Sequence, residues 1–289
     1  MKIQQITIIG TGLIGGSLAL ALKKRAFAVR VVGCDKEDVL AKAQARGAID
    51  ASVADPALAA AGSDVAVLAA PVGQIMDLLE RIGPQLAPQA FLTDVGSTKV
   101  DILARARSVF GAEAPRRFLG GHPMAGKEHS GIEHADAGLF QGAPWLFTPQ
   151  AGQRIDEGVS GEFVGLVKRA GAKPVVLDAG RHDRLCAWVS HLPQMLSTAL
   201  AAAMEEEFGD DADLQAVSGR ALRDMTRLAA SPYAMWRDIA LTNSSNLEAA
   251  LLKLEQKLAH VRENLRTAEL REEFERAKKF RHRDTEAQR

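Results

Sequence analysis

A single histidine in a glycine-rich stretch is the first candidate for chemistry in this sequence. His122 follows the apolar pair Phe118-Leu119 and the glycines Gly120 and Gly121, a pattern that predicts a strand ending in a loop. The pKa of an unperturbed histidine lies near neutrality, so an imidazole held beside a dinucleotide can accept the proton of an alcohol undergoing oxidation. A loop histidine that only hydrogen-bonds to nearby backbone fits the same pattern, so the rest of the chain must decide.

A glycine-rich turn near the N-terminus predicts a dinucleotide site. The pattern G-x-G-x-x-G lies between a predicted buried strand, residues 3–10, and a predicted helix, residues 13–26. Its glycines allow a tight turn, a close approach of backbone to pyrophosphate, and packing of helix on strand, while the helix N-terminus supplies amide donors. With a later strand-end loop included, the predicted cofactor-binding residues are Gly10, Gly12, Leu13, Ile14, Gly15 and Pro71.

Asp35 indicates NAD as the cofactor. It ends the next predicted strand, twenty residues after Gly15, where a carboxylate accepts hydrogen bonds from the adenosine ribose. The same charge would repel the 2′-phosphate of NADP, so NADP is less favoured, although Lys36 would soften the discrimination. The alternative is that Asp35 only caps the helix predicted over residues 36–46.

Strands and helices alternate up to Asp178, and no strand is predicted after it. The alternation is typical of a Rossmann-type, doubly wound parallel sheet, in which ligands bind beyond the carboxyl ends of the strands. From residue 179 onward the pattern is helical and is broken by Gly209, Gly219 and Pro232. We therefore expect a dinucleotide-binding domain over residues 1–178 and an all-helical domain over residues 179–289.

Two further features each allow two interpretations. Ser97 either caps the helix predicted to begin near Lys99 or holds a catalytic imidazole in orientation. Arg220, Arg223 and Arg227 share one helical face, which is either a solvated basic surface or a clamp for carboxylates. Pro193, within an apolar helical pattern, predicts a kink.

Composition excludes several classes of function. Lys plus Arg equals Asp plus Glu at 36 each, so no net field attracts nucleic acid or an anionic membrane, and a small-molecule partner is expected. Cys34 and Cys186 give no disulfide framework. Neither an export signal nor a transmembrane helix is expected, so the predicted location is the cytoplasm. No metal site is predicted.

The last part of the chain carries apolar residues at heptad spacing. They are Leu247, Leu251, Leu254, Leu258, Val261 and Leu265, and they predict a packing seam against helices of the same subunit or of a partner. After Arg266 the charges are mixed, which indicates a solvated helix.

Five motifs, taken together and in order, resemble the prephenate/arogenate dehydrogenase family of tyrosine biosynthesis. They are GTGLIGGS, DVGSTK, GGHPMAGKEHSG, SHLPQ and DMTRLAASPYAMWRDI, and the similarity runs from Gly10 to about Asn246. The resemblance implies an N-terminal dinucleotide domain and a helical C-terminal domain that binds substrate and forms most of a homodimer contact.

The resemblance also implies roles for particular residues. The family's catalytic histidine matches His122, its orienting serine Ser97, and its substrate-binding arginine Arg227. Other positions that match the family's active site are Glu128, His182, Asp224 and Trp236. Gln194 departs from the pattern, because some prephenate-specific members carry a histidine there that contacts the substrate side chain.

The implied reaction is an oxidative decarboxylation of prephenate or arogenate, giving 4-hydroxyphenylpyruvate or tyrosine. Hydride leaves C4 of the ring for the nicotinamide, CO2 departs, and the ring becomes aromatic. His122 would take the hydroxyl proton, Ser97 would align the imidazole, and Arg227 would hold the ring carboxylate.

Two alternatives remain open from the sequence. The β-hydroxyacid dehydrogenases combine the same two kinds of domain, but they rely on a lysine of the second domain, and no lysine here lies in a comparable motif. A dinucleotide-binding protein without activity would leave His122, Ser97 and Arg227 unexplained together.

Overall fold

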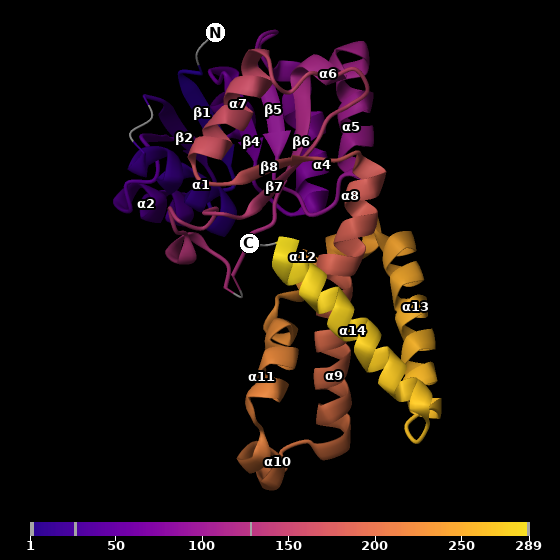
Figure 1. Cartoon of the computed structure of the whole chain (residues 1–289). Helices are drawn as coiled ribbons and strands as arrows, with labels where there is room; N and C mark the ends of the chain where they lie inside the picture. The colour runs from indigo at the N-terminus through magenta and orange to yellow at the C-terminus, as the bar shows by residue number, and fades with distance from the viewer. Residues whose placement is uncertain (1–2, 26–27, 128, 288–289) are drawn as a thin grey trace. The chain divides into compact units, whose positions relative to one another are not determined.

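The computed structural model describes residues 3–25, 28–127 and 129–287. They divide into two compact units, Met1–Ser244 and Ser245–Arg289, and every candidate site residue belongs to the first. This unit contains an eight-stranded sheet with the order β3-β2-β1-β4-β5-β6-β7-β8 (Figure 1). The strands are β1 (Gln5–Ile9), β2 (Arg30–Cys34), β3 (Ala51–Ser52), β4 (Val65–Leu68), β5 (Phe91–Asp94), β6 (Phe118–Pro123), β7 (Pro144–Thr148) and β8 (Lys173–Val176).

Helices cover both faces of the sheet, as the alternating pattern predicts. On one face, a core of buried apolar side chains joins the strands to α1 (Leu13–Lys24), α2 (Glu37–Ala45) and α7 (Gly158–Arg169). On the other face, a second core joins them to α3 (Pro56–Ala61), α4 (Val72–Ile82) and α5 (Val100–Phe110). The central strands are continuous apolar runs because both of their faces are buried. The Rossmann-type α/β fold is confirmed.

The structure corrects the sequence prediction at the sheet's second half. β6 runs on to Pro123, so His122 lies within a strand and not on a loop. β7 pairs with β6 in antiparallel orientation, with His122 opposite Leu146, whereas all other neighbours are parallel. Glycine weakens a strand, which is why the sequence suggested an end at Gly120. Antiparallel pairing with β7 continues the strand from Gly120 to Pro123, beyond the pairing of Phe118 and Leu119 with β5.

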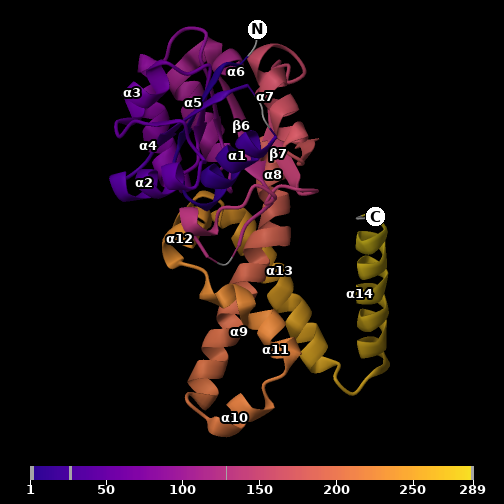
Figure 2. The ribbon, with the colours of Figure 1, turned by 90° about the vertical axis from the view of Figure 1, so that its left-hand side faces the viewer.

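From Ala179 onward every described element is helical, as predicted. In the first unit these elements are α8 (Ala179–Cys186), α9 (Leu192–Phe208), α10 (Ala212–Val217), α11 (Arg220–Thr226) and α12 (Tyr233–Thr242). Gly209 follows α9, Gly219 precedes α11 and Pro232 precedes α12, so all three predicted breaks lie at helix ends. α9 and α11 lie side by side, as both views show (Figures 1 and 2).

A π-helical turn connects α8 to α9 just before Pro193. It spans Ala187–His191, and the amide of Leu192 bonds to the carbonyl of Ala187, five residues back. A proline inside a helix has no amide to donate and crowds the carbonyl four residues earlier, and the wider turn accommodates both effects. The irregularity predicted from Pro193 is thus present as a π-turn, and such turns often occur at functional sites.

The second unit consists of α13 (Ser244–Glu263) and α14 (Ala268–Ala287). Lys257 of α13 pairs with Glu273 of α14 at 3.1 Å. The charged segment after Arg266 is helical, as predicted. Of the apolar seam, Leu247 is buried, whereas Leu258 and Leu265 are exposed. Across the described residues, no helix combines the length and the apolar character needed to cross a membrane.

Candidate active site

Three adjoining cavities follow the edge of the sheet where the parallel strands end. The first, about 560 Å³, lies at the ends of β1 and β2, and the second, about 380 Å³, lies at the ends of β4 and β5. The third, about 310 Å³, lies against α9 and α12. Ala70 lines the first two cavities, and Lys127, Ser231 and Met235 line the second and third. The cavities therefore form a continuous row.

The glycine-rich turn is built to admit a phosphate at the second cavity. Gly10 has a φ of 96°, and a Cβ on it would lie 2.1 Å from the carbonyl oxygen of Ala69. A Cβ on Gly15 would lie 1.9 Å from the carbonyl oxygen of Gly10, so helix and turn pack too closely for any side chain. A Cβ on Gly12 would have no neighbour within 4 Å, which leaves backbone open to a ligand. Gly12, Leu13, Ile14, Pro71 and Ser97 all line this cavity.

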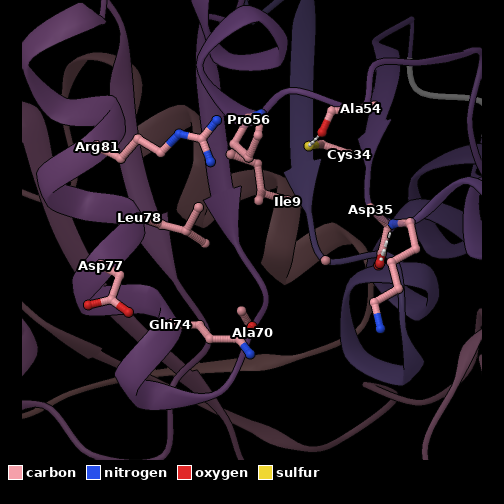
Figure 3. Close-up of a pocket in the computed structure, with 12 residues that line it drawn as sticks. Ile9, Cys34, Asp35, Ala54, Pro56, Ala70, Gln74, Asp77, Leu78 and Arg81 are labelled. Carbon is pink, nitrogen blue, oxygen red and sulfur yellow. Dashed lines mark hydrogen bonds between the residues drawn. The ribbon is translucent and has the colours of Figure 1, made fainter.

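Asp35 lies at the rim of the first cavity, opposite Arg81 (Figure 3). Its Oδ2 accepts a 2.7 Å hydrogen bond from the amide of Thr11, and its Oδ1 accepts one from the amide of Lys36. The N-cap of α2 is Lys36, so the interpretation of Asp35 as a mere helix cap is wrong. The carboxylate ties the glycine-rich turn to the end of β2 and faces the space where a ribose would lie.

His122 belongs to a buried chain of hydrogen bonds that ends at a carboxylate. Its Nδ1 lies 2.9 Å from Nε2 of His182, and Nδ1 of His182 lies 2.7 Å from Oδ1 of Asp183. Asp183 also accepts the amides of Lys99, at 2.7 Å, and Val100, at 2.9 Å. One backbone amide thus donates to each carboxyl oxygen, which makes Asp183 the acceptor of the network.

This chain fixes which nitrogen of His122 carries a proton. Because Asp183 only accepts, Nδ1 of His182 must donate, and Nε2 of a neutral His182 is then an acceptor. His122 therefore donates from Nδ1, which leaves Nε2 without a proton. The network presents His122 as a base whose free lone pair is on Nε2.

Electrostatics keep both imidazoles neutral. Burial lowers the pKa of His122 well below its ordinary value, and the neighbouring His182, Lys99 and His191 lower it further. Burial also lowers the pKa of His182, against the opposing effect of the hydrogen bond to Asp183. Lys99 itself is completely buried and forms an ion pair with Asp94. At neutral pH His122 is thus ready to accept a proton.

The structure gives Ser97 neither of its two predicted local roles. The N-cap of α5 is Lys99, and the amides of its first turn are satisfied by Asp183, so Ser97 is not the cap. Within the described part of the chain, the hydrogen bond of the His122 ring goes to His182 and not to Ser97. The Ser97 hydroxyl lines the second cavity instead.

The third cavity contains three polar residues that the sequence singled out. Arg227, Gln194 and Trp236 line it together. Nε2 of Gln194 donates to the carbonyl of Leu228 at 2.8 Å, which fixes the orientation of the amide and leaves Oε1 as the acceptor. Oε1 of Gln194 and Nε1 of Trp236 are buried and have no hydrogen-bond partner among the described residues. Both atoms belong to residues that line this cavity.

His191, which sequence reasoning did not single out, packs against a residue of the third cavity. It is buried, its ring packs edge-on against Trp236 with 6.0 Å between centroids, and its Nδ1 lies 3.1 Å from Nδ2 of Asn243. Burial lowers its pKa to about 4, so it is neutral. Its Nε2 has no partner among the described residues. Its place in SHLPQ, three residues before Gln194, was the available signal.

Other predicted residues are not brought into the cavities. Asp224 is exposed and pairs with Arg220 at 3.4 Å on α11. Arg223 donates to the carbonyl of Ser218. The helix ends at Thr226, so of the three predicted arginines only Arg227 turns into the third cavity, and the clamp is not formed. Glu128 lies outside the described residues.

The topology and the site together define the class of protein. A dehydrogenase that uses NAD needs a glycine-rich turn between β1 and α1, an acidic residue at the end of β2, and a base at the same edge of the sheet. Here the neutral, buried His122 lies near the end of β6, next to β5, and the residues that follow β5 line the second cavity. The chain is an NAD-dependent oxidoreductase.

Comparison with known proteins identifies the family. One family model, described as prephenate dehydrogenase, nucleotide-binding domain, matches residues 18–160, and another, described as prephenate dehydrogenase, dimerization domain, matches residues 178–280. The prephenate dehydrogenase of Lactococcus lactis subsp. cremoris is 34% identical over 261 residues, 90% of this chain and 70% of that protein. This chain belongs to the prephenate dehydrogenase family.

Solved structures of two similar proteins share the fold. A prephenate dehydrogenase from A. aeolicus in complex with hydroxyphenyl propionate and NAD+ has a TM-score of 0.86, with 28% identity and 99% of each chain covered. The arogenate dehydrogenase of Synechocystis has a TM-score of 0.78, with 28% identity, covering 97% of this chain and 99% of the other.

Proposed function

We propose that this chain oxidatively decarboxylates a cyclohexadienyl substrate of tyrosine biosynthesis with NAD, and that it prefers arogenate to prephenate. The observation that carries the catalytic part is the chain from Asp183 through His182 to His122, which leaves a lone pair on a buried base near the end of β6. Membership of the family favours this function over a β-hydroxyacid dehydrogenase and over a protein without activity.

The cofactor and the substrate occupy different cavities of the row. Bound in the first two cavities, NAD supplies the acceptor for the hydride. Arg227 holds the ring carboxylate of the substrate in the third cavity, so that the C4 hydroxyl approaches Nε2 of His122. His122 takes the hydroxyl proton as hydride leaves, its hydrogen bond to His182 keeps the ring oriented, and the charge of Asp183 stabilises the resulting imidazolium. Ser97, at the second cavity, remains a proposed second contact to the reacting group.

Trp236 lines the third cavity and His191 packs against it, and both suit binding of the substrate rather than the chemistry. Nε1 of Trp236 and Nε2 of His191 are buried donors that a carboxylate or carbonyl of the substrate would satisfy. An unpaired buried polar atom costs about 1–3 kcal/mol, so its pairing in the complex adds both affinity and selectivity. Glu128 and Asp224 keep only the roles that the family resemblance suggests.

Gln194 is the basis for the preference for arogenate. The two substrates differ in one group, a keto oxygen in prephenate and an ammonium in arogenate. Oε1 of Gln194 can only accept, so it can pair with the ammonium but not with the keto oxygen. Hydrogen bonds to charged groups contribute about 1.5–3 kcal/mol, which corresponds to roughly tenfold to a hundredfold in kcat/KM.

Initial rates of NAD reduction by the purified chain test this function. We expect turnover with both substrates, with a higher kcat/KM for arogenate, and absence of NAD reduction with either would refute the activity.

In Gln194→His, a donor replaces the fixed acceptor, and the ratio of kcat/KM for arogenate over prephenate should fall at least about tenfold. Thr198→Val, which removes only the part-buried 3.2 Å contact of the same amide, should keep the ratio. A Gln194→His enzyme with the wild-type ratio would show that this amide does not discriminate between the side chains of the two substrates.

Asp35 should determine the choice between NAD and NADP. In Asp35→Asn the repulsion of the 2′-phosphate is removed, so the ratio of kcat/KM with NAD over NADP is expected to fall about tenfold or more. Because Asp35 also holds the amide of Thr11, both cofactors should bind more weakly, and the ratio is therefore the quantity to measure. Thr11→Val, which loses only the 3.3 Å hydroxyl contact to Asp35, is the matched control for a loosened turn. An unchanged ratio in Asp35→Asn would leave Asp35 with a structural role alone.

We also propose that the chain acts as a homodimer through its C-terminal helices. Support comes from the dimerization-domain match over residues 178–280 and from large apolar side chains exposed there, among them Leu252, Leu258, Phe274 and Phe280.

A division of the chain into a nucleotide domain over 1–178 and a helical domain over 179–289 is in keeping with the last strand ending at Val176. Both cysteines are free, as expected in a reducing compartment such as the cytoplasm.

A further inference from the structure

We propose that His122, His182 and Cys186 form a buried site for a thiophilic divalent metal ion such as Zn²⁺, and that an ion bound there inhibits the enzyme. The inhibitory part rests on the proposed role of His122 as the base. The sequence predicted no metal site, because β6 supplies His122 while α8 supplies the other two residues, about sixty positions later. The fold is what brings the three side chains together.

The distances between the three ligand atoms suit a tetrahedral zinc ion. Nδ1 of His122 lies 2.9 Å from Nε2 of His182, and Sγ of Cys186 lies 3.9 Å and 3.6 Å from these two atoms. Zinc bonds of about 2.0–2.1 Å to nitrogen and 2.3 Å to sulfur place tetrahedral ligand atoms roughly 3.3–3.6 Å apart. Sγ of Cys186 also lies 3.9 Å from Nδ1 of His182, so it lies beside that ring. Rotation of the Cys186 side chain, moving the sulfur by roughly 1 Å or more, would bring it onto an ion held by the two nitrogens, with a water molecule as the fourth ligand.

The surroundings supply what such a site needs beyond its ligands. Nδ1 of His182 bonds to the carboxylate of Asp183 at 2.7 Å, the arrangement in which a metal-binding histidine is oriented by an acidic residue. The ion's two positive charges would be balanced by the Cys186 thiolate and by Asp183. The nearby positive charge of Lys99 is already paired with Asp94. His182 and Cys186 are completely buried, whereas 8% of His122 remains exposed and offers a path for entry.

Occupation of this site would change the proton positions on His122. A metal ion on Nδ1 displaces the proton from that nitrogen, and a neutral imidazole must then carry its proton on Nε2. Cys186 loses its thiol proton to solvent, so one proton is released for each ion bound. Nε2 becomes a donor and can no longer take the proton of the substrate. None of the three side chains lines the cofactor cavities, so binding of NAD should be unaffected.

Cobalt and zinc titrations of the chelator-treated full chain test the site. Without substrate, we expect one Co²⁺ per chain with a thiolate-to-metal charge-transfer band, which Cys186→Ala abolishes and Cys34→Ala retains. In the wild type, saturating Zn²⁺ should lower kcat about a hundredfold without changing KM for NAD. The Zn²⁺ concentration for half inhibition, measured for each enzyme against its own metal-free rate, should rise at least about tenfold in Cys186→Ala.

The spectrum and the rates separate the two parts of the inference. Absence of the band, or equal inhibition of wild type and Cys186→Ala, overturns the metal site and leaves the proposed function intact. A band at one ion per chain with an undiminished kcat overturns the inhibition, and the assignment of His122 as the base with it.

Discussion

Replacing His122 by asparagine should lower kcat by about 10²- to 10⁴-fold, the range over which a positioned general base contributes. The amide can still fill the space next to His182, but it has no lone pair basic enough to take the hydroxyl proton. Because His122 lines neither cofactor cavity, the dissociation constant of NAD should stay within about twofold. Steady-state rates together with fluorescence titration of the cofactor measure both quantities.

The control for this variant is another histidine that lies nearby in the sequence. His134 is exposed, stacks on His129 with 5.0 Å between ring centroids, and lines none of the three cavities. His134→Asn should therefore keep the wild-type kcat. If His122→Asn retained a kcat within tenfold of wild type, His122 would not be the base.

Replacing Asp183 by asparagine should lower kcat about a hundredfold or more, although Asp183 does not touch the substrate. The carboxylate accepts from His182, Lys99 and Val100, so the amino group of an asparagine must face a donor in either orientation. The negative charge that stabilises the imidazolium is lost in both. Where the amino group faces His182, the proton positions along the chain also reverse, and Nε2 of His122 becomes protonated. Loss of the aspartate in a serine-protease triad has a comparable cause and an effect of about 10⁴-fold.

A structural role for Asp183 is separated from a positioning role by a second carboxylate on the same helix. Asp178 caps α8 by accepting the amide of Arg181 at 2.8 Å. Asp178→Ala loses a helix cap worth about 1 kcal/mol and should lower Tm, and Asp183→Asn should lower Tm as well because its amino group faces a donor. Only Asp183→Asn should lose kcat while its KM values stay near those of wild type. Parallel losses of kcat in the two variants would mean that Asp183 acts through stability alone.

Much of the cofactor site could be predicted because its signals are local. The turn from Gly10 to Gly15 and the acidic residue that follows β2 depend on spacing within one βαβ unit. The second strand pairing of β6 could not be predicted in the same way, because it depends on β7, which begins 21 residues after Pro123. The short β3 and α3 were also missed, since two residues of strand carry no readable pattern.

The partners of His122 could be predicted only in part. The family resemblance pointed to His182, but it assigned the orientation of the imidazole to Ser97. In the structure His182 is the residue that orients the imidazole of His122, and Asp183 in turn holds His182. Asp183 also caps the start of α5, where no local side chain does so, although it lies 84 residues from Lys99. Such a long-range cap leaves no trace in the spacing of the sequence. Asp224 shows the opposite case, since its motif is matched while its side chain is exposed.

The central claim is that the buried carboxylate sets the proton positions on the reactive imidazole. Nitrogen-15 NMR of histidine-labelled protein measures the protonation of each ring nitrogen directly, and the signals of His122 are identified by their loss in His122→Asn. The account predicts a neutral ring at pH 7 with a protonated Nδ1 and an unprotonated Nε2. A His122 ring that carries its proton on Nε2, or on both nitrogens, would contradict it.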